Sequence, residues 1–111
     1  MSLFVSHIGD GITQGPGTEA MNDVTQLVTA AKAYHAEFGK MPEGDAASIL
    51  RALQGDNPKK IIFLEINSKK ISKDGLFLDP WGAPYLFDFS TSHAPWAYSR
   101  GNTRRDFKTW E

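Results

Sequence analysis

Residues 18–39, TEAMNDVTQLVTAAKAYHAEFG, decide the fold. Within them, polar residues such as Asp23 and Lys32 fall mostly on the side opposite to a run of apolar residues. That run has the three- and four-residue spacing of one helix face: Met21, Val24, Leu27, Val28, Ala31, Tyr34 and Phe38. Thr18 is the expected N-cap, and Gly39 is expected to end the helix as the residue after its last turn. The stretch therefore predicts an amphipathic helix of about twenty residues, about 30 Å long.

The residues before this helix form a different kind of segment. Residues 9–17 read GDGITQGPG, and this run of glycines around Pro16 predicts that no stable helix forms there. We interpret residues 1–17 as a flexible lead or a segment that is not native, with one short extended piece at residues 3–8, and residues 18–111 as the globular domain. The lead lacks the lysine of a phosphate-binding loop and the glycine spacing of a dinucleotide motif, so nucleotide binding is not expected.

The rest of the chain predicts one more helix and then strands. Asp45 is placed to cap a short helix that ends at Gly55. Residues 61–66, IIFLEI, predict a strand, with a short buried helix as the alternative. Residues 85–89 and 96–100 alternate as strands do. Helices first and strands last indicate the α+β class, with the long N-terminal helix packed on a small antiparallel β-sheet.

Composition excludes several classes of function. A chain of 111 residues, 41% hydrophobic and 23% charged, is expected to form one ordinary globular domain. It has no cysteine, which excludes disulfides, zinc thiolate sites and cysteine nucleophiles. A net charge of −1 gives no general attraction to nucleic acid. The basic pairs are interpreted as solvated turns and strand ends: Lys59 and Lys60, Lys69 and Lys70, Arg104 and Arg105.

Targeting and catalytic motifs are absent from the sequence. No apolar run reaches the ~20 residues of a membrane-spanning helix, so the protein is soluble or its targeting segment lies outside this sequence. His35 and Glu37 have the H-x-E spacing of zinc deaminases, but that chemistry also needs cysteines. There is no H-E-x-x-H and no G-x-S-x-G. We therefore expect a protein that is not an enzyme.

The stretch DPWGAPY at residues 79–85 contains more large and rigid residues than most surface turns. Asp, Pro and Gly at the first, second and fourth positions predict a type I turn at residues 79–82. Pro84 should hold Ala83 extended and direct the chain into the next strand. Trp81 is expected to pack this corner onto the body of the domain, so the stretch is explained as architecture.

Three stretches of the chain resemble one family. Residues 22–42 resemble the helix of the major pseudopilins of type II secretion systems, which ends in the pattern Tyr-x-x-Glu-aromatic-Gly-x-aromatic-Pro. Its matches here are Tyr34, Glu37, Phe38, Gly39, Met41 in the last aromatic place, and Pro42. The family's later DPWGNPY and YSLG motifs are similar to two segments of this chain, with matches at Asp79, Pro80, Trp81, Gly82, Pro84, Tyr85, Tyr98 and Gly101. The resemblance covers roughly residues 20–101.

The resemblance implies a pilin-like structural subunit. Family members carry an apolar N-terminal helix, which a prepilin peptidase cleaves and methylates and which anchors them in the bacterial inner membrane. Their globular part lies in the periplasm. They assemble with copies of themselves and with other pseudopilins into a filament that drives protein export, which requires head-to-tail contacts. No nucleic acid partner is implied, and contact with the membrane is implied only through the N-terminal helix.

The sequence departs from the family at two places. The family's helix runs continuously out of its anchor, whereas residues 9–17 interrupt it here. Family members often bind calcium in the loop after the YSLG strand, but the tail here puts Arg104, Arg105 and Lys108 among its acidic residues. Hard cations prefer several oxygen ligands and net negative charge. Ser99 and Asp106 match the calcium ligands loosely, so we expect no cofactor and no calcium, with an arginine in the ion's place as a hypothesis.

Two other functions stay open at this point. A type IV pilin-like or other prepilin-type subunit would share the same architecture. A small carbohydrate- or peptide-binding module could instead use Trp81, Trp96 and Trp110 as an exposed platform. Buried tryptophans would favour a filament subunit, and coplanar exposed ones would favour the binding module.

Overall fold

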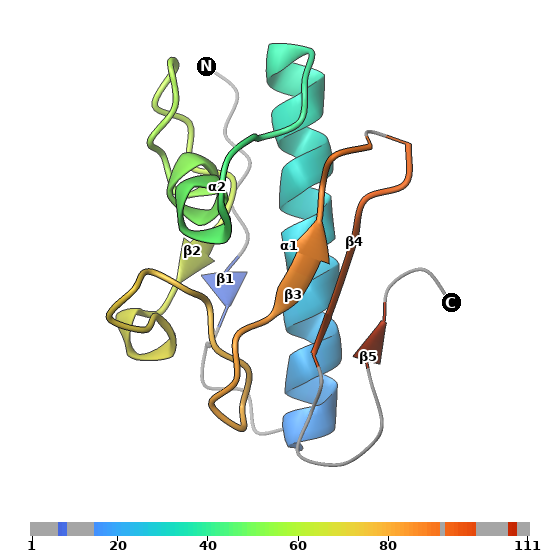
Figure 1. The fold of residues 1–111 in the computed structure, drawn as a ribbon, viewed down its shortest axis with the longest axis vertical. Helices are drawn as coiled ribbons and strands as arrows, with labels where there is room; N and C mark the ends of the chain where they lie inside the picture. Colours follow the sequence, from blue (N-terminus) through green and yellow to red (C-terminus); the bar gives the residue numbers. More distant parts are fainter. Residues whose placement is uncertain (1–6, 9–14, 92, 100–106, 109–111) are drawn as a thin grey trace.

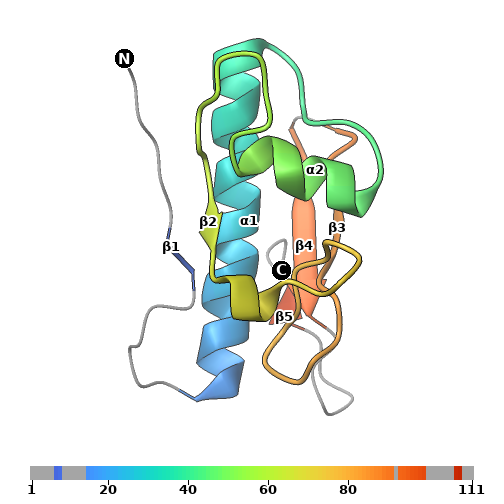
Figure 2. The same cartoon turned by 90° about the vertical axis from the view of Figure 1, so that its left-hand side faces the viewer.

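The computed structural model describes residues 7–8, 15–91, 93–99 and 107–108. Helix α1 (Pro16–Phe38) runs along the long axis of the molecule, and the strands β3 and β4 lie in front of it in Figure 1. Figure 2, turned by 90°, shows α1 and these strands as two layers, with α2 beside both. The described residues thus form a helix layer on a sheet layer.

Helix α1 begins earlier than the sequence predicts. Its N-cap is Gly15, with φ −66° and ψ 160°, and no side chain caps it. The prediction of Thr18 as N-cap is wrong, because Pro16 occupies the first helical position, where its fixed φ suits a helix and its missing N–H is not needed. The end of the helix is confirmed: Gly39 has φ 76°, and its N–H donates to the carbonyl oxygen of His35 over 2.8 Å.

Helix α2 (Ala46–Leu53) follows the predicted capping pattern. The Asp45 carboxylate accepts a hydrogen bond from the N–H of Ser48 over 2.8 Å, which satisfies one of the unpaired donors of the first turn. The C-cap is Gln54, followed by Gly55 with φ 118°. Both ends of this helix therefore lie where the sequence places them.

The antiparallel sheet has the strand order β3–β4–β5. Strand β3 (Leu86–Asp88) pairs with β4 (Trp96–Ser99), and β5 (Phe107–Lys108) pairs with the other edge of β4. Leu86 lies opposite Tyr98, and Asp88 lies opposite Trp96. The expected strands at residues 85–89 and 96–100 are confirmed where they are described, and so is the α+β class.

A second, parallel pairing was not predicted. Strand β1 (His7–Ile8) pairs with β2 (Glu65–Ile66), in register His7 to Glu65. The predicted strand at residues 61–66 is wrong over most of its length. The N–H groups of Phe63 and Leu64 donate to the carbonyl oxygen of Leu53 at the end of α2 instead of to a neighbouring strand. Of the expected extended piece at residues 3–8, only residues 7–8 are described.

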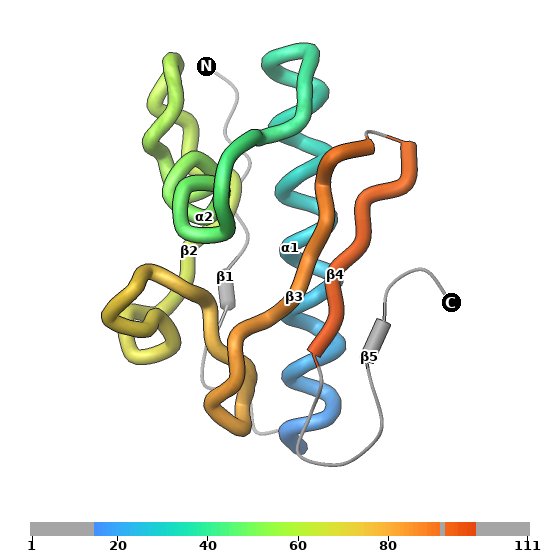
Figure 3. Tube along the Cα trace, viewed as in Figure 1, coloured from blue at the N-terminus to red at the C-terminus, as the bar shows by residue number. Residues whose placement is uncertain are grey.

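The segment between β2 and β3 returns to α1 through a short 3₁₀ helix, η1 (Ser68–Lys70). Figure 3 shows this segment crossing the lower left of the molecule before it enters β3. Two isolated antiparallel bridges, Ile71 to Phe77 and Leu78 to Pro84, hold it in shape. The segment thus brings Lys70 and the 79–85 corner to the first turns of α1.

The core lies between these elements. Its buried apolar residues come from α1, α2, the 61–64 segment and β4, together with Met41, Phe77, Tyr85 and Phe89. The largest fully buried ones are Phe63, Phe77, Leu27, Leu50, Leu53 and Leu64. Among the residues that the structure describes, four polar ones are buried with them: Asp23, Asn57, Asp79 and Ser99. Asn57 is satisfied locally, since its amide donates to the carbonyl oxygens of Ala52 and Ile61. The other three belong to the candidate site.

Candidate functional site

The carboxylate of Asp79 organises the corner at residues 79–85. Its Oδ1 accepts hydrogen bonds from the N–H groups of Trp81 and Ala83, each over 2.9 Å. The N–H of Gly82 donates to the Asp79 carbonyl oxygen over 3.0 Å, which closes the predicted turn. Gly82 has φ 89°, a conformation that glycine adopts without strain.

The same carboxylate joins the corner to the sheet. The Ser99 hydroxyl donates to Asp79 Oδ2 over 2.8 Å. Asp79 is 4% exposed and Ser99 is fully buried, so this bond lies in the interior. It links two of the segments that carry the pseudopilin resemblance, DPWGAPY and YSRG.

A second polar group, here named the polar bridge, consists of Glu19, Asp23, Lys70 and Tyr85; Asp23 and Tyr85 are buried, and the Glu19 side chain is 40% exposed. Lys70 Nζ donates to Glu19 Oε2 and to Asp23 Oδ2, each over 2.6 Å. The Tyr85 hydroxyl donates to the same oxygen of Asp23 over 2.6 Å. The bridge fastens the first two turns of α1 to η1 and to the end of the corner.

Burial dominates the electrostatics of the polar bridge. It raises the pKa of Asp23, although the hydrogen bonds from Lys70 and Tyr85 act in the opposite direction. Burial, followed by the hydrogen bond to Asp23, also raises the pKa of Tyr85 well above its usual range. The Lys70 ammonium lies 5.2 Å from the centroid of the Phe77 ring, which adds a cation–π contact.

The sequence-based placement of two bridge residues was wrong. The helical pattern predicts that Asp23 lies on the solvent side of its helix, but it is 2% exposed. The sequence predicts that Lys70 lies in a solvated turn, but its side chain is 14% exposed. Helical periodicity cannot reveal partners that arrive from a distant segment, so the bridge was missed.

The family pattern at the end of α1 is used for packing. The rings of Tyr34 and Phe38 lie 4.6 Å apart, and both contact Phe63. Glu37 pairs with Lys59 over 2.6 Å at the surface. Met41 and Pro42, which follow the turn at Gly39, are buried.

The remaining motif residues lie at or near the corner and β4. Trp81 is half-buried and packs against the core, as expected of a residue that covers the corner. Pro80 is half-buried and Pro84 is exposed. Tyr98 is half-buried, with its ring 5.5 Å from that of Trp96. Gly101 lies outside the described residues.

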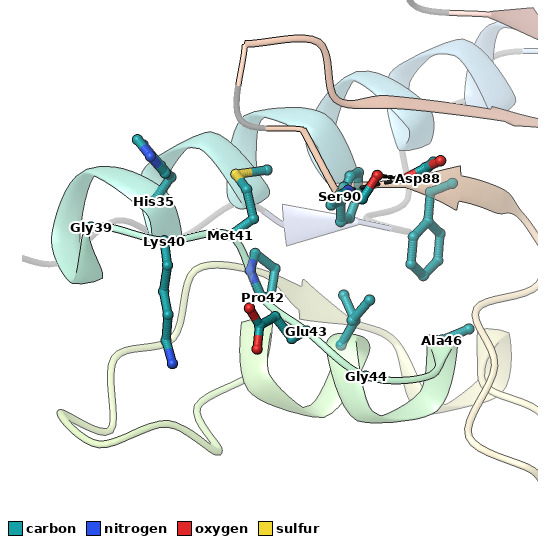
Figure 4. A pocket seen from close by; sticks show the side chains of 13 residues that line it. His35, Gly39, Lys40, Met41, Pro42, Glu43, Gly44, Ala46, Asp88 and Ser90 are labelled. Carbon is teal, nitrogen blue, oxygen red and sulfur yellow. Dashed lines mark hydrogen bonds between the residues drawn. The ribbon is translucent and has the colours of Figure 1, made fainter.

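A pocket of about 620 Å³ lies between the end of α1, the 39–46 segment and β3 (Figure 4). Met41, Ile49, Phe87 and Phe89 line it together with polar groups. Figure 4 shows the His35 and Lys40 side chains pointing in different directions, and the Asp88 carboxylate held by Ser90. The polar groups around the pocket do not converge on one point.

The calcium alternative rested on Ser99 and Asp106. Ser99 uses its hydroxyl proton for Asp79, and Asp106 lies outside the described residues. Among the residues that the structure describes, no group of three or more His, Asp or Glu side chains could hold a metal ion. Within the same residues, no helix is long and apolar enough to cross a membrane.

The tryptophan platform of the binding-module hypothesis is described at two of its three positions. Trp81 packs against the core, and Trp96 is half-buried on β4 beside Tyr98. Trp110 lies outside the described residues. The partial burial of Trp81 is what a structural corner requires.

Comparison with known proteins decides the family. The family model of the type II secretion system protein G matches residues 8–105, nearly the whole chain. This chain belongs to the type II secretion system protein G family. No curated protein and no solved structure matched. The resemblance seen in the pseudopilin motifs is thus confirmed. Protein G is a structural component of the secretion system, and this chain has its pilin-like α+β fold.

Proposed function

We propose that this protein is a pseudopilin that assembles with copies of itself into a type II secretion filament and thereby drives protein export. Membership of the protein G family supports this proposal. The structure supports it too, because side chains of the family motifs form hydrogen bonds and packing contacts inside the domain. The corner uses Asp79 for hydrogen bonds, and the end of α1 uses Tyr34 and Phe38 for ring contacts.

That observation favours a rigid building block. The carboxylate of Asp79 accepts from the corner and from β4, and that of Asp23 accepts from η1 and from the corner. Among the described residues, every fully buried side-chain polar atom has a hydrogen-bond partner. Satisfied buried networks of this kind fix one arrangement of the elements, which a repeating assembly needs.

The proposal includes a location and partners. The globular domain lies in the periplasm, and an apolar N-terminal helix of the family type anchors the subunit in the inner membrane. Copies of the domain contact one another head to tail, since a contact that does not close on itself builds an open filament. Other pseudopilins and components of the secretion system are the further partners.

Deletion of the gene tests this function directly. We expect secreted proteins to accumulate in the periplasm of the deletion strain, and the intact gene to restore export. Overproduction should give filaments visible by electron microscopy. Unchanged export after deletion, with the related pseudopilin genes also absent, would contradict the proposal.

We also propose that the domain needs no calcium. The charge pattern of the tail supports this, because Arg104, Arg105 and Lys108 lie among its acidic residues. Thermal melting with added calcium and with a chelator should give the same melting temperature. A clear rise with calcium would show that a site exists.

A further inference from the structure

Strand β3 is at one edge of its sheet, because the strand order is β3–β4–β5. The N–H of Tyr85, directly before β3, donates to the carbonyl oxygen of Phe77, so the main chain of Tyr85 points away from β4. Main-chain groups of successive strand residues point to alternate edges. Leu86 and Asp88 therefore make the hydrogen bonds to β4, and the N–H and carbonyl groups of Phe87 point to the other edge, here named the open edge.

The open edge of β3 has no partner in the described part of the chain. No hydrogen bond to another described element uses the main chain of Phe87 or Phe89 at this edge. Main-chain N–H and carbonyl groups are rarely left without a partner or water. An unpaired strand edge is also a template to which a further strand can add. Strand β3 therefore presents groups that the main chain of an extended peptide can bind.

The pocket between β3 and the 39–46 segment has a second wall of the same kind (Figure 4). Within the described residues, no hydrogen bond uses the main chain of residues 40–44. Pro42 restricts Met41 to an extended conformation. Both walls of the pocket thus carry main-chain groups that are open to a ligand.

The interior of the pocket is apolar. Met41, Ile49 and Phe89 line it and are buried, and the ring of Phe87 lies 4.8 Å from that of Phe89. The volume of about 620 Å³ is that of a site for a small ligand and is too small for a folded domain. The polar groups around the pocket are spread along it, which suits an extended ligand better than a compact one.

Two carboxylates beside the pocket favour a basic ligand. Ser90 donates to Asp88 Oδ1 through its hydroxyl and its N–H, and these bonds lower the pKa of Asp88. No cation among the described residues pairs with Asp88 or Glu43. The side chains of His35 and Lys40 point away from Asp88 (Figure 4). A lysine or arginine of the ligand would therefore complement the charge here.

We propose that this pocket binds an extended segment of another protein, in which apolar and basic residues alternate, as a strand added to the open edge of β3. Side chains alternate along a strand, so an apolar residue on the side of Phe87 is followed by one on the side of Asp88. The segment comes from a different protein, because the described strands of this chain are held in its own sheets. The inference goes beyond the proposed function, since a filament subunit needs no such site.

A synthetic peptide tests the strand addition. The probe is Thr-Val-Lys-Val-Thr with blocked ends, titrated into isotope-labelled protein. The NMR signals of the Phe87 and Phe89 amides should shift, and hydrogen exchange of the Phe87 amide should slow roughly tenfold or more at saturation.

The matched control is the same peptide with every second amide N-methylated, made in both possible frames. At least one frame should lose binding, because a methylated amide cannot donate to the wall it faces. Binding of both methylated peptides as tight as that of the parent would overturn strand addition, and so would an absence of binding by the parent.

A bulky side chain tests the position of the site. Ala46 lines the pocket, and Ala46→Trp should weaken binding of the peptide roughly tenfold or more by steric exclusion. Ala36→Trp makes the same change at an exposed position of α1 away from the pocket and should bind like the unmodified protein. An Ala46→Trp variant with an unchanged melting temperature and unchanged binding would contradict the site.

The charge is tested without altering the pocket's shape. Asp88→Asn should weaken binding of the lysine peptide, and it should not affect a peptide with threonine in place of the lysine. Asp74→Asn, at an exposed carboxylate away from the pocket, is the matched control. Equal effects of the two substitutions on the lysine peptide would contradict the pairing with Asp88.

Sedimentation of the protein alone tests the source of the segment. Any self-association should be the same in Ala46→Trp as in the unmodified protein, and the peptide should not change it. Self-association that Ala46→Trp and the peptide both abolish would mean that a second copy fills the pocket, and the assignment to a different protein would fail.

Discussion

Ser99 and Asp79 are joined through the interior of the protein, although they lie twenty residues apart in the chain. The serine hydroxyl donates to one carboxylate oxygen, and the N–H groups of Trp81 and Ala83 occupy the other. One carboxylate thus holds both the corner and the end of β4. The pseudopilin motifs DPWGAPY and YSRG meet at this hydrogen bond.

Removal of the Ser99 hydroxyl should therefore destabilise the fold. Ser99→Ala leaves Asp79 Oδ2 without this donor in a buried site, and we expect a loss of about 1–3 kcal/mol in the free energy of unfolding. Ser68→Ala, at an exposed serine of η1, is the matched control and should change little. Urea denaturation measures both variants. Equal stability of Ser99→Ala and the unmodified protein would contradict the role of the bond.

The polar bridge should contribute more to the free energy of unfolding than a surface ion pair does. Lys70→Met leaves the carboxylate of Asp23 buried without its cation, and the expected loss is about 3–5 kcal/mol. Lys59→Met breaks the pair with Glu37, in which the two side chains are 55% and 29% exposed, and should cost less than about 1 kcal/mol.

A second substitution checks the cause of that loss. Because the cost of Lys70→Met comes from an isolated buried charge, adding Asp23→Asn should recover part of the stability. Chemical denaturation of the single and double variants gives the comparison. A double variant less stable than Lys70→Met alone would point to packing instead of charge.

The Asp45 cap of α2 predicts that the stability of the folded state depends on pH. The hydrogen bonds from Ser48 lower the pKa of Asp45 below its ordinary value of 3.8. A depressed pKa means that the ionised carboxylate stabilises the folded state above pH 3.8, and that this stabilisation is lost as the pH falls through the folded-state pKa. Asp45→Asn keeps a capping group that does not titrate. Melting temperatures at several pH values should show the advantage of the aspartate shrinking in acid; a constant difference would contradict the prediction.

The end of α1 depends on glycine for a backbone reason. Gly39 has φ 76°, and a Cβ atom added there would meet no other atom within 4 Å. Gly39→Ala should therefore cost about 1–2 kcal/mol through backbone strain alone. Gly39→Asn should cost less, because asparagine tolerates this conformation. Melting temperatures of the unmodified protein and the two variants give the order of stability. An alanine variant as stable as the asparagine variant would argue against backbone strain.

The elements with local signals could be predicted from the sequence. The apolar spacing of α1, the glycine at its end and the cap at Asp45 act within a few residues of one another. The same holds for the turn at residues 79–82 and the alternating strand that follows it. Each of these features appears in the structure because neighbouring residues determine it.

The predictions that were wrong concern features that depend on distant partners or on the first turn of a helix. Residues 61–66 have strand-like composition, but only Glu65–Ile66 form a strand, and the N–H groups of Phe63 and Leu64 donate to the carbonyl oxygen of Leu53 at the end of α2. Asp23 lies at a helix position that looks solvated until Lys70 and Tyr85 arrive. The start of α1 was misplaced because Pro16 is unfavourable inside a helix and favourable at its first position.

The polar bridge has a mechanical consequence. Lys70 holds Glu19 and Asp23, one turn apart at the N-terminal end of α1, and Tyr85 holds the second of them. A pulling force that enters α1 at that end reaches these bonds before it reaches the rest of the helix. The force would therefore be transmitted through these bonds to η1 and the corner, and the C-terminal turns of α1 would carry little tension.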